Sequence, residues 1–154
     1  MMKLNLEADF VDFVNLCNKY EVEYLVIGGY AVSFHGYPRA TKDLDICIKI
    51  SEENAIKMLQ VINDFGFASL NLTKEDFLQR DLIIQLGHEP VRIDIINDLT
   101  GVPFEKAWEN KKEIVFEGVT INFIGYTDLI KVKENSGRPQ DVADVSKLKS
   151  RKKK

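Results

Sequence analysis

The sequence contains little cysteine or histidine, and this scarcity excludes several kinds of site. Cys17 and Cys47 are the only cysteines in the 154-residue chain, which also has two histidines. Neither a CxxC pair nor a pair of histidines at metal-ligand spacing is present. A zinc site or a disulfide framework is therefore not indicated, and both cysteines are expected to be buried thiols of a reducing compartment.

Long apolar runs and an excess of positive charge are also missing. No run approaches the roughly 20 apolar residues of a membrane span, and the N-terminal segment MMKLNLEADF lacks the apolar core of a signal peptide. We therefore expect a cytoplasmic protein with no membrane partner. The formal net charge of −3 attracts no nucleic acid overall, so a polynucleotide substrate would need a local basic patch.

The composition that remains is typical of a soluble globular domain. Hydrophobic residues make up 45% of the chain and charged residues 29%, which is enough apolar material to form a core. No internal repeat, linker or low-complexity segment is visible. We expect a single domain over residues 1–150, followed by a basic tail at residues 151–154.

The most informative stretch is 24–50, YLVIGGYAVSFHGYPRATKDLDICIKI. Its first four residues are an apolar run typical of a strand, and Gly28-Gly29 ends the run where the chain turns or approaches another group closely. The apolar pattern at residues 31–34 then predicts a short helix. The unpaired N–H groups at the start of that helix could hold a phosphate without a basic side chain.

Asp43 and Asp45 follow in a segment, DLDICI, whose polar and apolar residues alternate. This pattern predicts a half-buried strand with both carboxylates on one face. From one face the two carboxylates can bind one Mg²⁺ or bridge two ions, and a cation between them would relieve their repulsion. The alternative is a hairpin whose Asp-rich face is simply exposed to solvent.

Together these residues resemble a known family. Gly28-Gly29, Gly36 and Asp43-x-Asp45 are similar to the hG[G/S]…Dh[D/E]h signature of the DNA-polymerase-β-like nucleotidyltransferases, in their minimal bacterial branch. The resemblance implies an α/β fold (α+β by stricter naming), with a mixed sheet of about five strands and helices chiefly on one side. It also implies an enzyme that uses Mg²⁺ or Mn²⁺ to move a nucleoside monophosphate from a triphosphate such as ATP or GTP to an acceptor hydroxyl.

Members of this family have a third carboxylate on a neighbouring strand, and Asp94 is the best candidate. In the segment VRIDII, residues 91–96, the alternation places Arg92 and Asp94 on one face and the isoleucines Ile93 and Ile95 on the other. The resemblance implies a catalytic and metal-binding set in which Asp94 also takes the proton from the acceptor. That set consists of Asp43, Asp45 and Asp94.

Asp94 also has competing interpretations. It could be a structural carboxylate of the strand that is paired with Arg92 or Arg80. If Asp94 is not the third carboxylate, Asp98 and Asp81 are the weaker alternatives, because each is expected at the end of an element.

The C-terminal segment carries a second resemblance. LIKVK at residues 129–133 and GRPQDVAD at residues 137–144 look like the ending of AbiEii-type and related toxin-like nucleotidyltransferases. This implies that Lys133 neutralises triphosphate charge as a point cation, with Asp141 orienting Lys133 or Arg138. The alternative is a solvated helix with charge pairs. Arg39, Thr41 and Lys42, just before the aspartate pair, also match the pattern of the small branch and could contact phosphate or simply face solvent. Gly28 and Gly29 complete the predicted substrate-binding set.

One position departs from the family pattern. Tyr30 follows the glycines, whereas larger relatives often have Gly-Ser with a hydroxyl that contacts phosphate. Backbone amides would have to replace that hydroxyl.

The rest of the chain predicts helices at residues 5–20, 52–65, 103–108, 128–134 and from 139 onward, with strands at 81–86, 114–116 and 119–124. Ser51 and Thr127 are the predicted N-caps, and Gly66 and Gly137 the predicted helix ends.

The leading functional hypothesis is a minimal metal-dependent nucleotidyltransferase. It could be the toxin of a toxin–antitoxin pair that modifies RNA or protein, with a cognate antitoxin as its partner. A second version modifies a small molecule, as antibiotic nucleotidyltransferases do. The non-enzymatic alternative is a nucleotide-binding module that has kept the fold and lost turnover.

Overall fold

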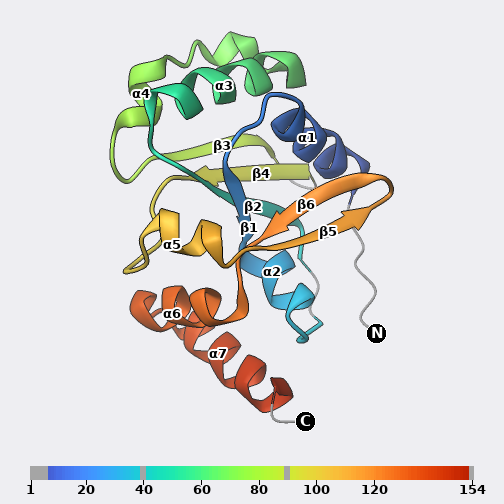
Figure 1. The fold of residues 1–154 in the computed structure, drawn as a ribbon, viewed down its shortest axis with the longest axis vertical. Coiled ribbons are helices and arrows are strands. Elements are labelled where there is room, and N and C mark those ends of the chain that lie inside the picture. The colour runs from blue at the N-terminus through green and yellow to red at the C-terminus, as the bar shows by residue number, and fades with distance from the viewer. Residues whose placement is uncertain (1–6, 39–40, 89–90, 153–154) are drawn as a thin grey trace.

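A computed structural model describes residues 7–38, 41–88 and 91–152. Its centre is a six-stranded sheet in the order β3-β4-β2-β1-β6-β5 (Figure 1). The strands are β1 (Tyr24–Ile27), β2 (Asp43–Ile48), β3 (Ile83–His88), β4 (Val91–Ile96), β5 (Lys112–Phe116) and β6 (Val119–Phe123). The helices are α1 (Ala8–Lys19), α2 (Gly28–Phe34), α3 (Glu52–Ile62), α4 (Lys74–Leu78), α5 (Phe104–Glu109), α6 (Tyr126–Ser136) and α7 (Pro139–Lys152), with helical turns η1 (Asn63–Phe67) and η2 (Ala68–Leu70).

The sheet mixes parallel and antiparallel neighbours. β1 pairs antiparallel with β2 and parallel with β6, and β2 pairs parallel with β4. β3 and β5 form the two edges, each in an antiparallel hairpin with the next strand. The predicted fold class is therefore confirmed, with six strands rather than about five, because both strands of the β5–β6 hairpin join the main sheet.

Alternating residues of β2 and β4 point to opposite sides of the sheet. Leu44 and Ile93 are each 1% exposed, on the face that forms the core. Asp45 and Asp94 are half-buried on the other face. α1 and α3 pack against each other, and α1 lies over the Ile93 side, where its Phe10 is fully buried. The acidic face is thus kept apart from the main apolar layer.

The middle of the chain follows its predicted signals with one shift. Ser51 caps α3, since its Oγ accepts a hydrogen bond from the Asn54 backbone N–H at 3.0 Å. Gly66 takes a left-handed φ of +102° inside η1, where the helix loses its regular geometry. β3 begins at Ile83 instead of residue 81, because Asp81 has a φ of +61° and cannot extend the strand.

The two C-terminal helices form a pair at one end of the sheet, at the bottom of Figure 1. Gly137 ends α6 with a φ of +66°, as predicted. The prediction of Thr127 as N-cap is wrong: α6 begins at Tyr126, because the Leu129 N–H already bonds the Gly125 carbonyl at 2.9 Å. None of the described helices is both long and apolar enough to cross a membrane.

Candidate active site

The glycine pair at the end of β1 lies directly against the strand that carries the aspartates. Ile27 and Asp45 are Cα partners across β1 and β2. Gly28 has a φ of +69°, and a Cβ on it would overlap Asp45 Oδ2. A Cβ on Gly29 would lie 2.6 Å from Thr41 Oγ1. Both positions therefore require glycine, so that the backbone can approach the acidic strand closely.

The three predicted catalytic carboxylates share one face of the sheet. Asp43 and Asp45 are both half-buried on β2. Asp45 and Asp94 are Cα partners in the parallel β2–β4 ladder, and both line the same cleft. Partners in a sheet ladder start about 5 Å apart, so the carboxylates of the two strands meet above the sheet.

Asp45 has an unusual protonation equilibrium. Burial raises its pKa from the ordinary 3.8 to about 7, and the nearby charges of Asp94 and Asp43 push in the same direction. Arg92 opposes the rise with its positive charge. In the absence of a cation, Asp45 therefore keeps a proton at a pH where an exposed aspartate has lost it.

Arg92 joins the other two carboxylates. Its Nη2 lies 2.8 Å from Asp43 Oδ2, and its Nε and Nη2 lie 2.9 and 3.1 Å from the two oxygens of Asp94. The pairing is a consequence of register, since Asp43 and Arg92 are Cα partners on β2 and β4. The ion-pair interpretation of Asp94 thus describes a contact that exists, and Arg92 extends it to Asp43.

The donor chemistry of this cluster fits a hard divalent cation, since carboxylate oxygens are the preferred ligands of Mg²⁺. Asp43 Oδ1 is buried and has no hydrogen-bond partner among the described residues, and such an orphaned oxygen is normally satisfied by a donor or an ion. As the side chains stand, however, no group of three or more His, Cys, Asp or Glu among the described residues is arranged to hold a metal ion. Arg92 engages carboxylate oxygens that an ion would need.

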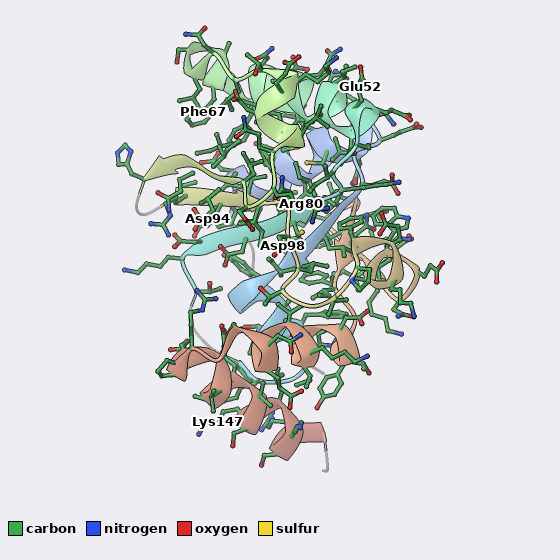
Figure 2. All side chains as sticks on the ribbon, turned by 90° about the vertical axis from the view of Figure 1, so that its left-hand side faces the viewer. Glu52, Phe67, Arg80, Asp94, Asp98 and Lys147 are labelled. Carbon is green, nitrogen blue, oxygen red and sulfur yellow. The ribbon has the colours of Figure 1, made fainter. Side chains whose placement is uncertain are left out.

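A cleft of about 300 Å³ separates this acidic face from the C-terminal helices. Figure 2 shows Asp94 and Asp98 on the sheet side, above the helical pair α6 and α7. The lining combines charged and apolar side chains. The charged and polar lining consists of Gly28, Asp45, Asp94, Asp98, Thr100, Lys133, Ser136, Arg138 and Asp141, and the apolar lining of Ile27, Ile83, Ile96, Ile124, Leu129 and Val132.

Lys133 lies on the helical wall of the cleft, but it is already neutralised. Lys133 is only 6% exposed, and its Nζ donates to Asp141 Oδ1 and to Asp144 Oδ2, both at 2.9 Å. The bond to Asp144 ties α6 to α7 within a buried cluster. Lys133 is thus not a solvated helix residue, and two carboxylates already surround the charge expected to face a triphosphate.

Asp141 organises the polar end of this wall. It accepts hydrogen bonds from Lys133, from Ser136 and from Arg138, whose Nε lies 3.0 Å from Asp141 Oδ2. Burial raises the pKa of Asp141, but the hydrogen bonds of Ser136 and Lys133 and the positive charges outweigh burial and hold the pKa below its usual value. The Arg138 side chain is 78% exposed, so it is the more accessible cation at this end.

The remaining predicted residues are distributed unevenly around the cleft. Thr41 lies beside Gly29, and its Oγ1 donates to the Asp43 carbonyl at 3.4 Å. Lys42 is exposed, and it is not among the described residues that line the cleft. Arg39 lies outside the described residues. Of the alternative carboxylates, Asp98 lines the cleft whereas Asp81 does not.

Sequence reasoning missed functional candidates that depend on tertiary contact. Arg92 was visible as a neighbour of Asp94 on the same strand face, but its contact with Asp43 follows from the β2–β4 register. Asp144 stands three residues after Asp141, a spacing that puts both on one helix face. That spacing was the available signal for a shared partner, which proves to be Lys133.

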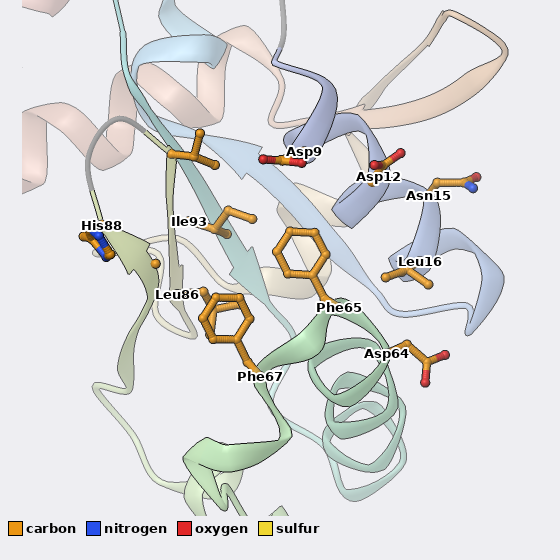
Figure 3. A pocket seen from close by; sticks show the side chains of 12 residues that line it. Asp9, Asp12, Asn15, Leu16, Asp64, Phe65, Phe67, Leu86, His88 and Ile93 are labelled. Atoms are coloured by element: carbon orange, nitrogen blue, oxygen red, sulfur yellow. The ribbon is translucent and has the colours of Figure 1, made fainter.

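A second hollow, of about 700 Å³, lies on the opposite face of the sheet (Figure 3). It is bounded by α1, η1 and the β3–β4 hairpin, with Phe65 and Phe67 stacked at its floor. Ile93 lines this hollow, whereas Asp94, the next residue, lines the cleft. Successive strand residues face opposite ways, so the sheet separates this larger hollow from the carboxylates of Asp45 and Asp94.

Comparison with solved structures identifies the fold. Over 92% of its length the chain superposes on 90% of a candidate nucleotidyltransferase of Thermotoga maritima, with a TM-score of 0.60 and 15% identity. The chain has the nucleotidyltransferase fold. It also resembles the lincosamide antibiotic adenylyltransferase LnuA in its lincomycin-bound form. The similarity covers 96% of this chain and 99% of LnuA, with a TM-score of 0.55 and 18% identity.

An antigenic nucleotidyltransferase-like protein of Paracoccidioides brasiliensis shares the fold as well. The similarity covers 93% of this chain and 77% of that protein, with a TM-score of 0.52 and 13% identity. No family model and no curated protein sequence matches the chain. The nucleotidyltransferase fold therefore rests on structure, and the AbiEii-type specificity stays a prediction.

Proposed function

We propose that this protein is a metal-dependent nucleotidyltransferase. It moves a nucleoside monophosphate from a nucleoside triphosphate to an acceptor hydroxyl and releases pyrophosphate. One observation carries the proposal: within a nucleotidyltransferase fold, Gly28 touches Asp45, and Asp45 is in register with Asp94, which lines the same cleft. A phosphate chain held near the glycine turn would meet the carboxylates directly.

The carboxylates divide the work of the reaction. Asp43 and Asp45 would hold Mg²⁺ or Mn²⁺, with Asp94 as a third ligand. The bound cation would neutralise charge on the triphosphate and its leaving group. Asp94 would accept the proton of the acceptor hydroxyl, so that its oxygen forms a bond to the α-phosphorus while the bond between that phosphorus and the pyrophosphate oxygen breaks.

The glycine turn and the cations around the cleft would position the triphosphate. Gly28 and Gly29 bring the backbone against Asp45 and Thr41, so their N–H groups are proposed to contact the phosphates beside the carboxylates, and Thr41 presents a hydroxyl next to Gly29. Lys42 and Arg39 precede the aspartates in sequence and are proposed to contact phosphate as well. On the opposite wall Arg138 is the exposed cation. Lys133 and Asp141 support it from the buried cluster.

The acceptor has two candidate classes. The adenylyltransferase LnuA, which the chain matches over nearly the full length of both proteins, is bound to lincomycin, and this favours a small-molecule acceptor. The sequence at residues 137–144 resembles the ending of AbiEii-type toxins, which supports RNA or protein as acceptor and an antitoxin as partner. A non-catalytic nucleotide-binding module would bind the triphosphate without either acceptor.

Calorimetry with each nucleoside triphosphate tests the binding step. The parent protein should bind at least one triphosphate in Mg²⁺, and the Asp43→Ala/Asp45→Ala variant should bind none, because carboxylates and triphosphate repel one another without a cation. Equally tight binding in excess chelator would remove the metal from the mechanism. Equal binding by the double variant would place the nucleotide elsewhere.

A further inference from the structure

Arg92 holds the carboxylates in an arrangement that leaves little room for another cation. Its guanidinium reaches across from β4 to Asp43 on β2 and returns to Asp94 on its own strand. Asp94 contributes both of its oxygens to these contacts, and Asp43 contributes Oδ2. A planar guanidinium matches carboxylate geometry well, and such charge-assisted pairs are among the stronger hydrogen bonds in proteins.

The same oxygens are the ones that a divalent cation would bind. Carboxylate ligation of Mg²⁺ needs oxygens about 2.0–2.1 Å from the ion, and a guanidinium nitrogen cannot share that space. Asp43 Oδ1 meanwhile stays buried without a partner in the described part of the chain, so Arg92 satisfies only part of the acidic cluster. The Arg92 side chain is 29% exposed, so part of it already faces solvent.

We propose, resting on the nucleotidyltransferase function, that Arg92 is an internal cation that competes with the catalytic metal. In the metal-free protein it holds Asp43 and Asp94 together and limits their repulsion. When the ion binds, the guanidinium leaves both carboxylates. Arg92 thereby lowers the affinity for the metal and stabilises the metal-free fold, so that the site is formed before the nucleotide arrives.

The competing interpretation is that Arg92 is a permanent brace that keeps the carboxylates aligned for the metal. The two interpretations predict opposite signs. Removing a competitor strengthens metal binding, whereas removing a brace weakens it. Metal binding can be measured without nucleotide and without an acceptor, so the test does not depend on turnover.

The experiment is calorimetric titration of the metal-free protein with Mn²⁺, comparing the parent with Arg92→Met. Lys49→Met is the matched control. Lys49 pairs with Glu23 at 3.4 Å, and its side chain is 31% exposed. This variant therefore removes a cation of similar exposure that does not contact Asp43 or Asp94. We expect Arg92→Met to bind Mn²⁺ about tenfold more tightly or better, the scale of one charge-assisted hydrogen bond. Lys49→Met should bind like the parent.

Thermal melts of the same proteins supply a second readout. Arg92→Met should melt at a lower temperature than the parent in chelator and regain most of that loss in saturating Mn²⁺. Equal or weaker Mn²⁺ binding by Arg92→Met, with normal binding by the parent, would overturn the role of Arg92 and leave the proposed function standing. Absence of Mn²⁺ binding by both the parent and Arg92→Met would overturn both.

A measurement on the parent covers the case in which Arg92→Met does not fold. The Arg92 Nε–H, which donates to Asp94 at 2.9 Å, should give an NMR signal that exchanges slowly with water, assigned by its loss in Arg92→Lys. Saturating Mg²⁺ should shift this signal and speed its exchange. An unchanged signal in the Mg²⁺-bound protein would show that Arg92 stays in place, and would contradict the proposal.

Discussion

Asp45 and Asp94 face each other as Cα partners across two parallel strands, and the charge of Asp94 raises the pKa of Asp45. Two carboxyl groups in such contact cannot both be charged at low cost. Burial is the main cause of the raised pKa of Asp45, about 7, and the charges of Asp94 and Asp43 add to it. Several expected outcomes depend on this pair and on the cleft above it.

The pH dependence of stability should reveal the Asp45 proton. Between pH about 4 and about 7 the native protein keeps a proton that unfolded Asp45, with its ordinary pKa of 3.8, has released. The native state then binds more protons, so the free energy of unfolding in chelator should fall as pH rises through this window and level off above it. Denaturant unfolding of the parent and of Asp45→Asn across this range measures how the free energy of unfolding of each depends on pH. Parallel pH dependences of the two proteins would refute the raised pKa of Asp45.

Asp94→Asn should separate nucleotide binding from transfer. The amide preserves the shape of the side chain but cannot accept the proton of the acceptor hydroxyl. Triphosphate affinity should change little, while single-turnover transfer should fall about 10²-fold or more. Asp98→Asn is the control, since Asp98 is an exposed carboxylate in the same cleft. If Asp98→Asn loses transfer and Asp94→Asn keeps it, the two roles must be exchanged.

Lys133→Met tests whether this lysine is mainly structural. Its pairs with Asp141 and Asp144 are buried, and removing one member of a buried charge cluster costs about 3–5 kcal/mol of unfolding free energy. Lys149→Met removes the exposed α6–α7 pair with Glu134, and should cost only about 0–1 kcal/mol. Equal stability of both variants in urea would instead leave Lys133 available for triphosphate.

Gly28→Ala should cost more than its backbone conformation alone explains. Gly28 and Gly137 have φ values of +69° and +66°, but an added Cβ meets Asp45 at Gly28, whereas at Gly137 it meets no atom of the described residues within 4 Å. The left-handed conformation costs about 1–2 kcal/mol at either site. The excess loss of stability in Gly28→Ala over Gly137→Ala therefore measures the contact with Asp45. No excess would mean that the glycine turn can move away from the carboxylates.

The sequence predicted the elements whose signals are local. Alternation around Asp43 and Asp94 indicated both strands and the face on which the carboxylates lie, and Gly137-x-Pro139 indicated the break between the last two helices. These signals depend on side-chain period and backbone conformation, which neighbouring residues determine.

The features that the sequence left unpredicted arise from contacts between distant elements. Arg92 reaches Asp43 only because β2 and β4 pair in one particular register. Lys133 is buried only because α7 folds back and presents Asp144 to α6. A charge pattern cannot show whether a cation faces solvent, substrate or a buried carboxylate, since that depends on which helix covers it.

Transfer of label from the triphosphate tests the central claim most directly. The protein, Mg²⁺ and a cell extract are incubated with each nucleoside triphosphate, labelled at either the α- or the γ-phosphate, and the products are separated into RNA, protein and small molecules. The account predicts stable label on one class of acceptor from the α-labelled nucleotide, none from the γ-labelled one, and none with Asp43→Ala/Asp45→Ala. Acceptor labelled from the γ-position, or equal labelling by the double variant, would contradict nucleotidyl transfer at this site.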